Sequence, residues 1–168
     1  MPLLVGVIGV LVIAGFFIFT PTASRTEPKI LPTPSQLTQE VTEAKAAFTI
    51  FTNGTLRLFT ASMYHNLSTD VYIEASNPNI VHIKKAGLTW NDFFKTLPMK
   101  LMRDCLMTGT GQTFCTNGTH SLKFYVNGYA NADALDLKIN DGDRLLVSYG
   151  TRDDALVESQ LQQIPKID

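Results

Sequence analysis

Residues 89–97, TWNDFFKTL, carry the clearest amphipathic helix pattern in this chain of 168 residues, and they decide its fold class. Thr89 is a favourable N-cap, and Asp92 stands three residues later at the capping-box position, with a shorter acid than the usual Glu. Pro98 ends the helix because proline cannot continue it. A small domain with one main helix must bury the apolar side of that helix, so we expect a core that includes Trp90, Phe93, Phe94 and Leu97.

Strand patterns flank this helix on both sides. Residues 48–59, FTIFTNGTLRLF, form two apolar stretches around Asn53-Gly54, which is a strong hairpin signal. Residues 99–120, which contain both cysteines, are predicted to be irregular. The other predicted strands are residues 71–73, 80–83, 122–126 and 144–149. Strands combined with a single main helix predict an α+β fold.

Composition divides the chain into regions. Residues 24–35 carry three prolines and predict a semi-extended spacer, and residues 36–47, QLTQEVTEAKAA, predict a short helix. Asp153 and Asp154 are expected to open a terminal helix whose Leu156, Val157, Leu161 and Ile164 pack back on the domain. The predicted regions are a membrane segment, a stalk with its short helix, a domain with one core, and a helical tail, at residues 1–23, 24–47, 48–150 and 151–168.

An apolar run from Leu3 to Phe19 precedes every charged residue of the chain. As a helix, its seventeen residues would extend about 25 Å, close to the thickness of a bilayer core. A retained single-span membrane anchor is the favoured interpretation. A secretory signal peptide cleaved near Thr22 and Ser24 is the rival, although no Lys or Arg precedes the run and the run is longer than usual for a signal. A buried helix is the third alternative.

The cysteines and the glycosylation triplets favour a domain outside the cytoplasm. Cys105 and Cys115 are the only two cysteines, and a closely spaced pair in an exported domain predicts a disulfide. Asn53, Asn66 and Asn117 each begin an acceptor triplet for N-glycosylation. We therefore expect a single-pass protein of the cell membrane with its main domain extracytoplasmic.

The predicted order of elements resembles that of β-grasp (ubiquitin-like) domains. LTWNDFFKTL would be the grasped helix, and LKFYVNG followed by LDLKINDGDRLLVSYG is similar to the closing half of such domains. IVHIKKAGLTWNDFF, at residues 80–83 and 88–94, also resembles the "IIHIE…TLGQFF" pattern of uncharacterised membrane-anchored extracytoplasmic proteins of archaea and bacteria. The resemblance implies a mixed sheet packed on one main helix, and it carries no known activity. The usual His-rich first hairpin of that group is replaced here by Asn53, Thr55 and Arg57.

Several classes of function find no support in the sequence. A net charge of −1 gives no sign of the excess of basic residues that is typical of nucleic-acid-binding domains. The chain contains no Walker-type loop, GxSxG, HExxH or GxGxxG motif. Gly109-Thr110-Gly111 is too short to cradle a phosphate. Nine residues separate the two cysteines in a loop, whereas redox motifs have two residues between their cysteines.

Copper binding is the sharpest chemical alternative. Thioether and imidazole ligands in an oxidising compartment suit copper better than zinc. The structural alternative is that Met102 and Met107 fill gaps in the core, and that His82, between Val81 and Ile83, lies on the solvent face of a strand. The candidate copper ligands are Met63, His65, Met102, Met107 and His120.

The sequence favours a non-catalytic role with no cofactor. We expect an interaction module or accessory subunit of a membrane or cell-surface assembly, whose partners are the membrane and other protein subunits. The terminal helix and residues 36–47 are candidates for contacting a neighbour. A copper-binding or copper-delivery domain is the alternative, and an enzyme of a thiol-redox or carbohydrate pathway is a weaker third.

Overall fold

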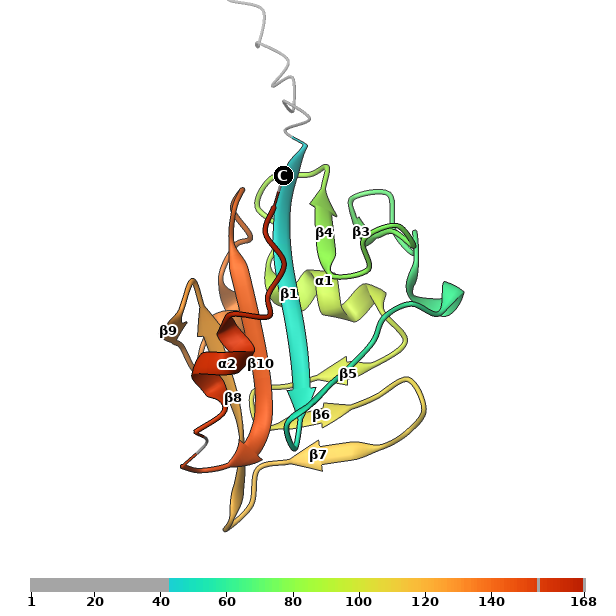
Figure 1. Ribbon diagram of the computed structural model, residues 1–168. Helices are drawn as coiled ribbons and strands as arrows, with labels where there is room; N and C mark the ends of the chain where they lie inside the picture. Colours follow the sequence, from blue (N-terminus) through green and yellow to red (C-terminus); the bar gives the residue numbers. More distant parts are fainter. Residues whose placement is uncertain (1–42, 154, 168) are drawn as a thin grey trace, which may run out of the picture. The chain divides into compact units, whose positions relative to one another are not determined.

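A mixed β-sheet forms the centre of the computed structural model, which describes residues 43–153 and 155–167 (Figure 1). Within these residues the sheet has seven strands in the order β3-β4-β1-β10-β8-β9, with β2 paired to β1. The central pair, β1 and β10, is parallel, with Ala47 opposite Arg144 and Thr52 opposite Tyr149; the other pairs are antiparallel. The strands are β1 Ala44–Thr52, β2 Thr55–Leu56, β3 Val71–Ile73, β4 Ile80–Ile83, β8 His120–Val126, β9 Tyr129–Ala130 and β10 Arg144–Thr151. The fold is α+β, as predicted.

Strand β1 begins earlier than the sequence indicated. The predicted helix over residues 36–47 is wrong for residues 44–47, which are the first part of β1, and residues 36–42 lie outside the described part. Ala44 and Ala46 pack in the same core as Phe48, with the alternation of a strand. Pairing with β4 along residues 44–47, and with β10 at Ala47, therefore overrides the helical preference of the alanines.

The predicted hairpin after β1 is confirmed. Asn53 and Gly54 have φ angles of 50° and 77°, as a tight hairpin turn requires, and they place Thr52 opposite Thr55. The pairing is short, because β2 ends at Leu56. The Arg57 N–H still donates to the Ile50 carbonyl of β1, at 2.8 Å, and the next strand along the chain is β3.

The predicted helix is also confirmed, as α1 Trp90–Thr96. The Thr89 hydroxyl accepts a hydrogen bond of 3.1 Å from the Asp92 backbone N–H, and the Asp92 carboxylate accepts one of 2.9 Å from the Thr89 N–H. Hydrogen bonds from the backbone and hydroxyl of Thr89 hold the pKa of Asp92 below its ordinary value. The Phe93 and Phe94 rings lie 5.2 and 5.7 Å from that of Phe48, so the helix packs directly on β1.

The two faces of the sheet are covered by different elements (Figure 1). Helix α1 covers one face, and α2 Val157–Leu161 with the residues after it covers the other. Arg144 Nη2 donates to the carbonyl oxygens of Leu161 and Ile164, at 3.4 and 2.7 Å, and so holds this C-terminal segment. The terminal helix packs back as predicted, but it begins at Val157 rather than at Asp153, and Leu156 remains 51% exposed.

Residues 100–115 form a second sheet, so the prediction that residues 99–120 are irregular is wrong. Its strands are β5 Lys100–Leu101, β6 Cys105–Met107 and β7 Thr113–Cys115. The predicted disulfide is present, and it joins Cys105 to Cys115 where β6 and β7 pair directly. Strands of two or three residues are too short to show an alternating pattern, which explains the error.

Two 3-10 turns complete the described elements, η1 Ser62–Tyr64 and η2 Ala134–Asp136. Across residues 43–153 and 155–167, no helix has the length and apolar character needed to cross a membrane. The predicted anchor, from Leu3 to Phe19, and the proline-rich spacer lie outside the described residues.

Candidate ligand pocket

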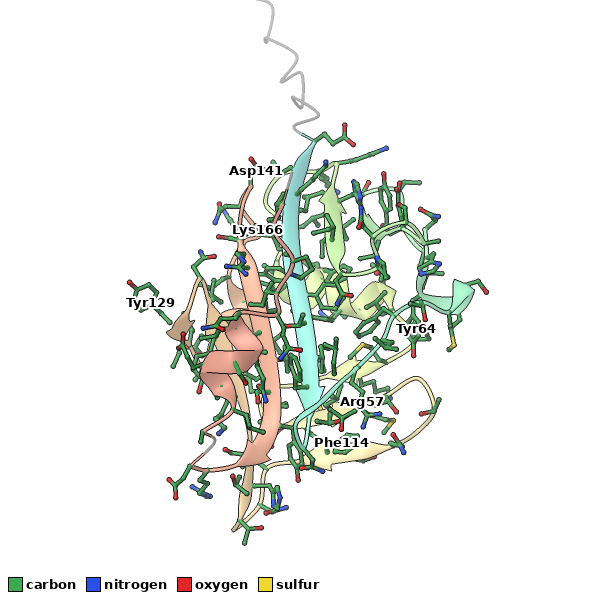
Figure 2. All side chains as sticks on the ribbon, in the orientation of Figure 1. Arg57, Tyr64, Phe114, Tyr129, Asp141 and Lys166 are labelled. Carbon is green, nitrogen blue, oxygen red and sulfur yellow. A yellow bond between two sulfur atoms is a disulfide. The ribbon has the colours of Figure 1, made fainter. Side chains whose placement is uncertain are left out.

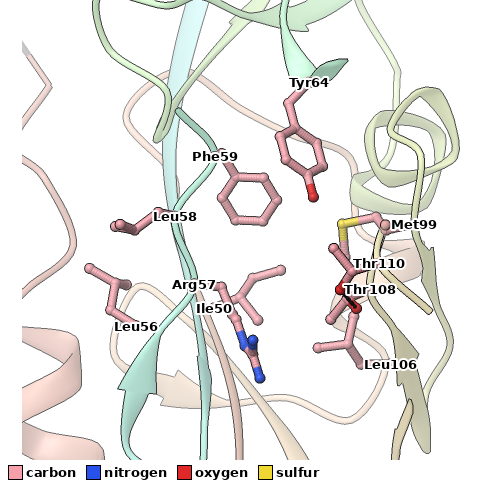
Figure 3. Close-up of a pocket in the computed structure, with 11 residues that line it drawn as sticks. Ile50, Leu56, Arg57, Leu58, Phe59, Tyr64, Met99, Leu106, Thr108 and Thr110 are labelled. Carbon is pink, nitrogen blue, oxygen red and sulfur yellow. Dashed lines mark hydrogen bonds between the residues drawn. The ribbon is translucent and has the colours of Figure 1, made fainter. Parts of the chain in front are cut away.

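A pocket of about 210 Å³ lies between the chain that follows β2 and the tip of the β6–β7 hairpin (Figure 3). At about 30 Å³ per water molecule, it has room for about seven waters. It is therefore smaller than the roughly 300–1,000 Å³ of sites that enclose a drug-sized ligand, and it suits a single side chain. Its floor is apolar and consists of Ile50, Phe59 and Leu106.

The pocket owes its shape to two aromatic residues that follow the hairpin. Phe59 is 4% exposed, and its ring packs edge-on against Phe48 of β1 at 5.0 Å. Tyr64, at the end of η1, packs edge-on against Phe59 at 5.1 Å. Figure 3 shows the Tyr64 hydroxyl directed into the space between the hairpin side and the β6–β7 side. These contacts fix one wall of the pocket to the main core.

Arg57 supplies the positive charge of the pocket. Its Nε donates to the Thr52 hydroxyl at 2.5 Å, and its Nη1 donates to the Gln112 side-chain oxygen at 3.1 Å. The guanidinium carbon lies 4.8 Å from the centre of the Phe114 ring, within the range of a cation–π contact. Figure 2 shows Arg57 and Phe114 close together on the side of the domain away from Tyr129. Arg57 therefore joins the two sheets through neutral partners.

The ion pairs of the described residues lie elsewhere. They join His82 to Glu74, Lys85 to Asp70, and Arg103 to both Asp133 and Asp136. Asp136 and Asp133 raise the pKa of Arg103, as expected for a cation between two carboxylates. Arg57 is half-buried and has no carboxylate partner within the part of the chain that the structure describes.

Gly109 brings the β6–β7 tip close to Tyr64. A Cβ at this position would lie 2.8 Å from the carbonyl oxygen of Pro98 and 2.9 Å from the Tyr64 hydroxyl. Only glycine fits without a shift of its neighbours. The hydroxyls of Thr108 and Thr110 lie 3.0 Å apart on either side of it and face the pocket, as the dashed line of Figure 3 marks.

The candidate copper ligands lie at several places on the domain. Met63 is 45% exposed beside Gly109, and His65 Nε2 donates to the Phe59 carbonyl at 2.8 Å. The His120 ring stacks on Tyr149, at 5.6 Å. The expectation that Met102 and Met107 fill gaps in the core is wrong, since they are 50% and 38% exposed.

His82 is half-buried rather than solvent-facing, with its ring stacked on Tyr72 at 5.2 Å. In the described residues no group of three or more His, Cys, Asp or Glu side chains is placed to hold a metal ion. Copper binding stays a prediction.

The three glycosylation triplets begin at exposed residues. Asn53 and Asn66 have φ angles of 50° and 53° and lie in turns. The Asn117 side-chain oxygen accepts hydrogen bonds from the backbone N–H groups of Thr119 and His120, both at 2.9 Å. Asn117 therefore has a local structural role, and glycosylation at the three positions stays a prediction.

The sequence did not predict this pocket. In the sequence, Arg57 stands out only as a replacement in a His-rich hairpin, and no motif marks Tyr64. The segment Gly109-Thr110-Gly111 is one local signal in the sequence, because two glycines around a threonine indicate a tight turn of the backbone. The rest of the pocket comes from residues up to 60 positions apart, such as Ile50 and Thr110, which only the fold brings together.

Comparison with protein-family models, with curated proteins and with solved structures finds no match to this chain.

Proposed function

We propose that this chain is a non-catalytic interaction module, or accessory subunit, of a membrane or cell-surface assembly, and that it binds its protein partner at the pocket beside Arg57. The observation that carries the proposal is the mouth of that pocket. Leu58 lines the pocket and is 67% exposed, while Phe59 and Leu106 line it and are buried. Met63, whose terminal methyl lies beside Gly109 of the lining, is 45% exposed. A small pocket beside exposed apolar side chains is typical of a protein interface in which one anchoring side chain contributes much of the affinity.

The strand order supports a β-grasp-like domain in this role. The first long strand, β1, and the last strand, β10, are parallel neighbours at the centre of the sheet, and α1 crosses one face. β-Grasp domains commonly act by presenting a surface or a strand edge to a partner, although a fold alone does not establish a function. The resemblance to membrane-anchored extracytoplasmic proteins is part of the same proposal.

The location rests on two features. The charge-free run from Leu3 to Phe19 has the composition of a membrane anchor. The disulfide between Cys105 and Cys115 is of the kind that persists in oxidising compartments and is rare in the cytosol of most organisms. Both favour a domain held at the outer side of a membrane.

Co-purification of the full chain from membranes of its native host tests the proposal. The tagged chain is extracted in mild detergent, and co-migrating subunits are identified by mass spectrometry. We expect Leu58→Asp to lose a stoichiometric partner, because it places a charge at the mouth of the pocket. Leu137→Asp is the matched control, since Leu137 is 38% exposed and does not line the pocket. Retention of every partner by Leu58→Asp would show that this pocket is not the interface.

A further inference from the structure

We infer that the pocket receives the carboxylate of an Asp or Glu side chain from the partner protein, and that Arg57 binds it. The inference rests on the proposed function and adds the chemistry of the bound group. It follows from charge complementarity, because Arg57 is a half-buried cation at the pocket wall without a carboxylate of its own among the described residues.

The partners of Arg57 orient it without neutralising it. The Thr52 hydroxyl and the Gln112 amide oxygen each take one hydrogen bond and are both uncharged. A guanidinium has five N–H donors, so three remain on Nη1 and Nη2. A guanidinium held at a fixed angle with donors to spare can bind a carboxylate through two parallel hydrogen bonds.

Arg103 provides a contrast within the same protein. Its Nη1 and Nη2 lie 2.9 and 2.5 Å from the carboxylates of Asp133 and Asp136. Arg103 is thus already paired, although it is on the surface. Arg57 is more enclosed and therefore gains more from a carboxylate, because a charge pair is stronger where water is partly excluded.

The remaining polar groups of the pocket suit an acid. The hydroxyls of Tyr64, Thr108 and Thr110 all line the same space. Thr108 and Thr110 share one hydrogen bond of 3.0 Å, so one of these two hydroxyls and that of Tyr64 can each donate to a carboxylate oxygen. Ile50 and Leu106 provide an apolar wall for the methylene groups of the entering side chain. A volume of about 210 Å³ admits one such side chain, and it leaves little room for a larger cofactor.

Methionine methyl NMR of the full chain in detergent micelles tests the inference. The protein is labelled with ¹³C-methyl methionine, and it is titrated with acetyl-Leu-Glu-Leu-amide or with the neutral acetyl-Leu-Gln-Leu-amide. We expect the Glu peptide to shift the methyl resonances of Met63 and Met99, which lie at the pocket, and the Gln peptide to bind about tenfold or more weakly. Arg57→Gln removes this preference, and Arg103→Gln, the matched control, keeps it.

The other outcomes distinguish failure of the carboxylate inference from failure of the proposed function. If the Glu and Gln peptides shift the methionine methyl resonances equally, the carboxylate inference is overturned. This comparison uses the unaltered protein, so it does not depend on whether the Arg57→Gln variant folds. The proposed interaction function then still stands if Leu58→Asp loses the partner in co-purification. Free 4-methylpentanoate is titrated in parallel, and binding at least as tight as that of the Glu peptide would assign the pocket to a small acid and overturn the inference. Preference for the Glu peptide together with an unchanged partner in Leu58→Asp would overturn the proposed function alone.

Discussion

A Cβ at Gly109 would lie 2.9 Å from the hydroxyl oxygen of Tyr64. The two residues belong to different parts of the chain, since Gly109 is at the tip of the β6–β7 hairpin and Tyr64 ends η1. Their close approach draws the tip of the second sheet against the wall that Phe59 and Tyr64 form on the main core. The pocket therefore exists only while both sheets keep this position.

Gly109→Ala should lower the melting temperature and weaken binding of the Glu peptide. The added methyl group would meet the Pro98 carbonyl at 2.8 Å, and backbone must move to relieve it. Overpacking of this kind costs about 1–3 kcal/mol. Gly118→Ala is the control, because no atom lies within 4 Å of its Cβ position, and we expect a change within about 0.5 kcal/mol. Equal melting temperatures for the two variants would show that the contact with Tyr64 is not tight.

Replacing Cys105 and Cys115 with Ser should lower the melting temperature by about 10 °C or more. The disulfide closes a loop with a sequence separation of 10, which stabilises the fold by about 2.5–3 kcal/mol in the chain-entropy model. The β6–β7 tip carries Thr108 and Thr110, so affinity for the Glu peptide should fall as well. Differential scanning calorimetry and thiol titration of the unreduced, denatured protein check this. Two free thiols would contradict the disulfide.

Asp92→Asn should destabilise the domain at neutral pH and less so in acid. The pKa of Asp92 is held below its ordinary value of 3.8 by hydrogen bonds from Thr89, so its carboxylate stabilises the fold above that pH. This contribution is lost as the pH falls through the lowered pKa. We expect a difference of about 0.5–1 kcal/mol at pH 7 that shrinks below about pH 4. A difference independent of pH, measured by urea unfolding, would show that the charge is not involved.

A fragment that starts at Ser35 should be soluble and folded. The buried residues of both core clusters, among the residues that the structure describes, lie between Ala44 and Ile164, so we expect them to pack without the run from Leu3 to Phe19. Circular dichroism and gel filtration check this. Aggregation of the fragment, with the full chain dispersed in detergent, would mean that the apolar run belongs to the core and is not an anchor.

The elements that the sequence predicted best have local signals. The Thr89–Asp92 capping box and the Asn53-Gly54 turn depend on residues next to one another in the chain, and both are confirmed. The prediction of helix for residues 44–47 is wrong because their alanines carry no strand signal, and pairing with β4, joined by β10 at Ala47, decides their state. The second sheet was missed because its strands have two or three residues. The pocket depends on contacts between distant segments, such as Arg57 with Phe114, which no local pattern reports.

Site-specific photo-cross-linking in native membranes tests whether a partner protein places an acidic side chain in the pocket beside Arg57. A photoreactive phenylalanine analogue replaces Leu58 in one variant of the full chain and Leu137, outside the pocket, in another. We expect one cross-linked protein from position 58 and none from position 137, with an Asp or Glu close to the cross-linked residue of the partner peptide. We also expect Arg57→Gln to abolish the cross-link. A cross-link that persists in Arg57→Gln, or a partner peptide without an acidic residue, would contradict binding of a partner carboxylate by Arg57.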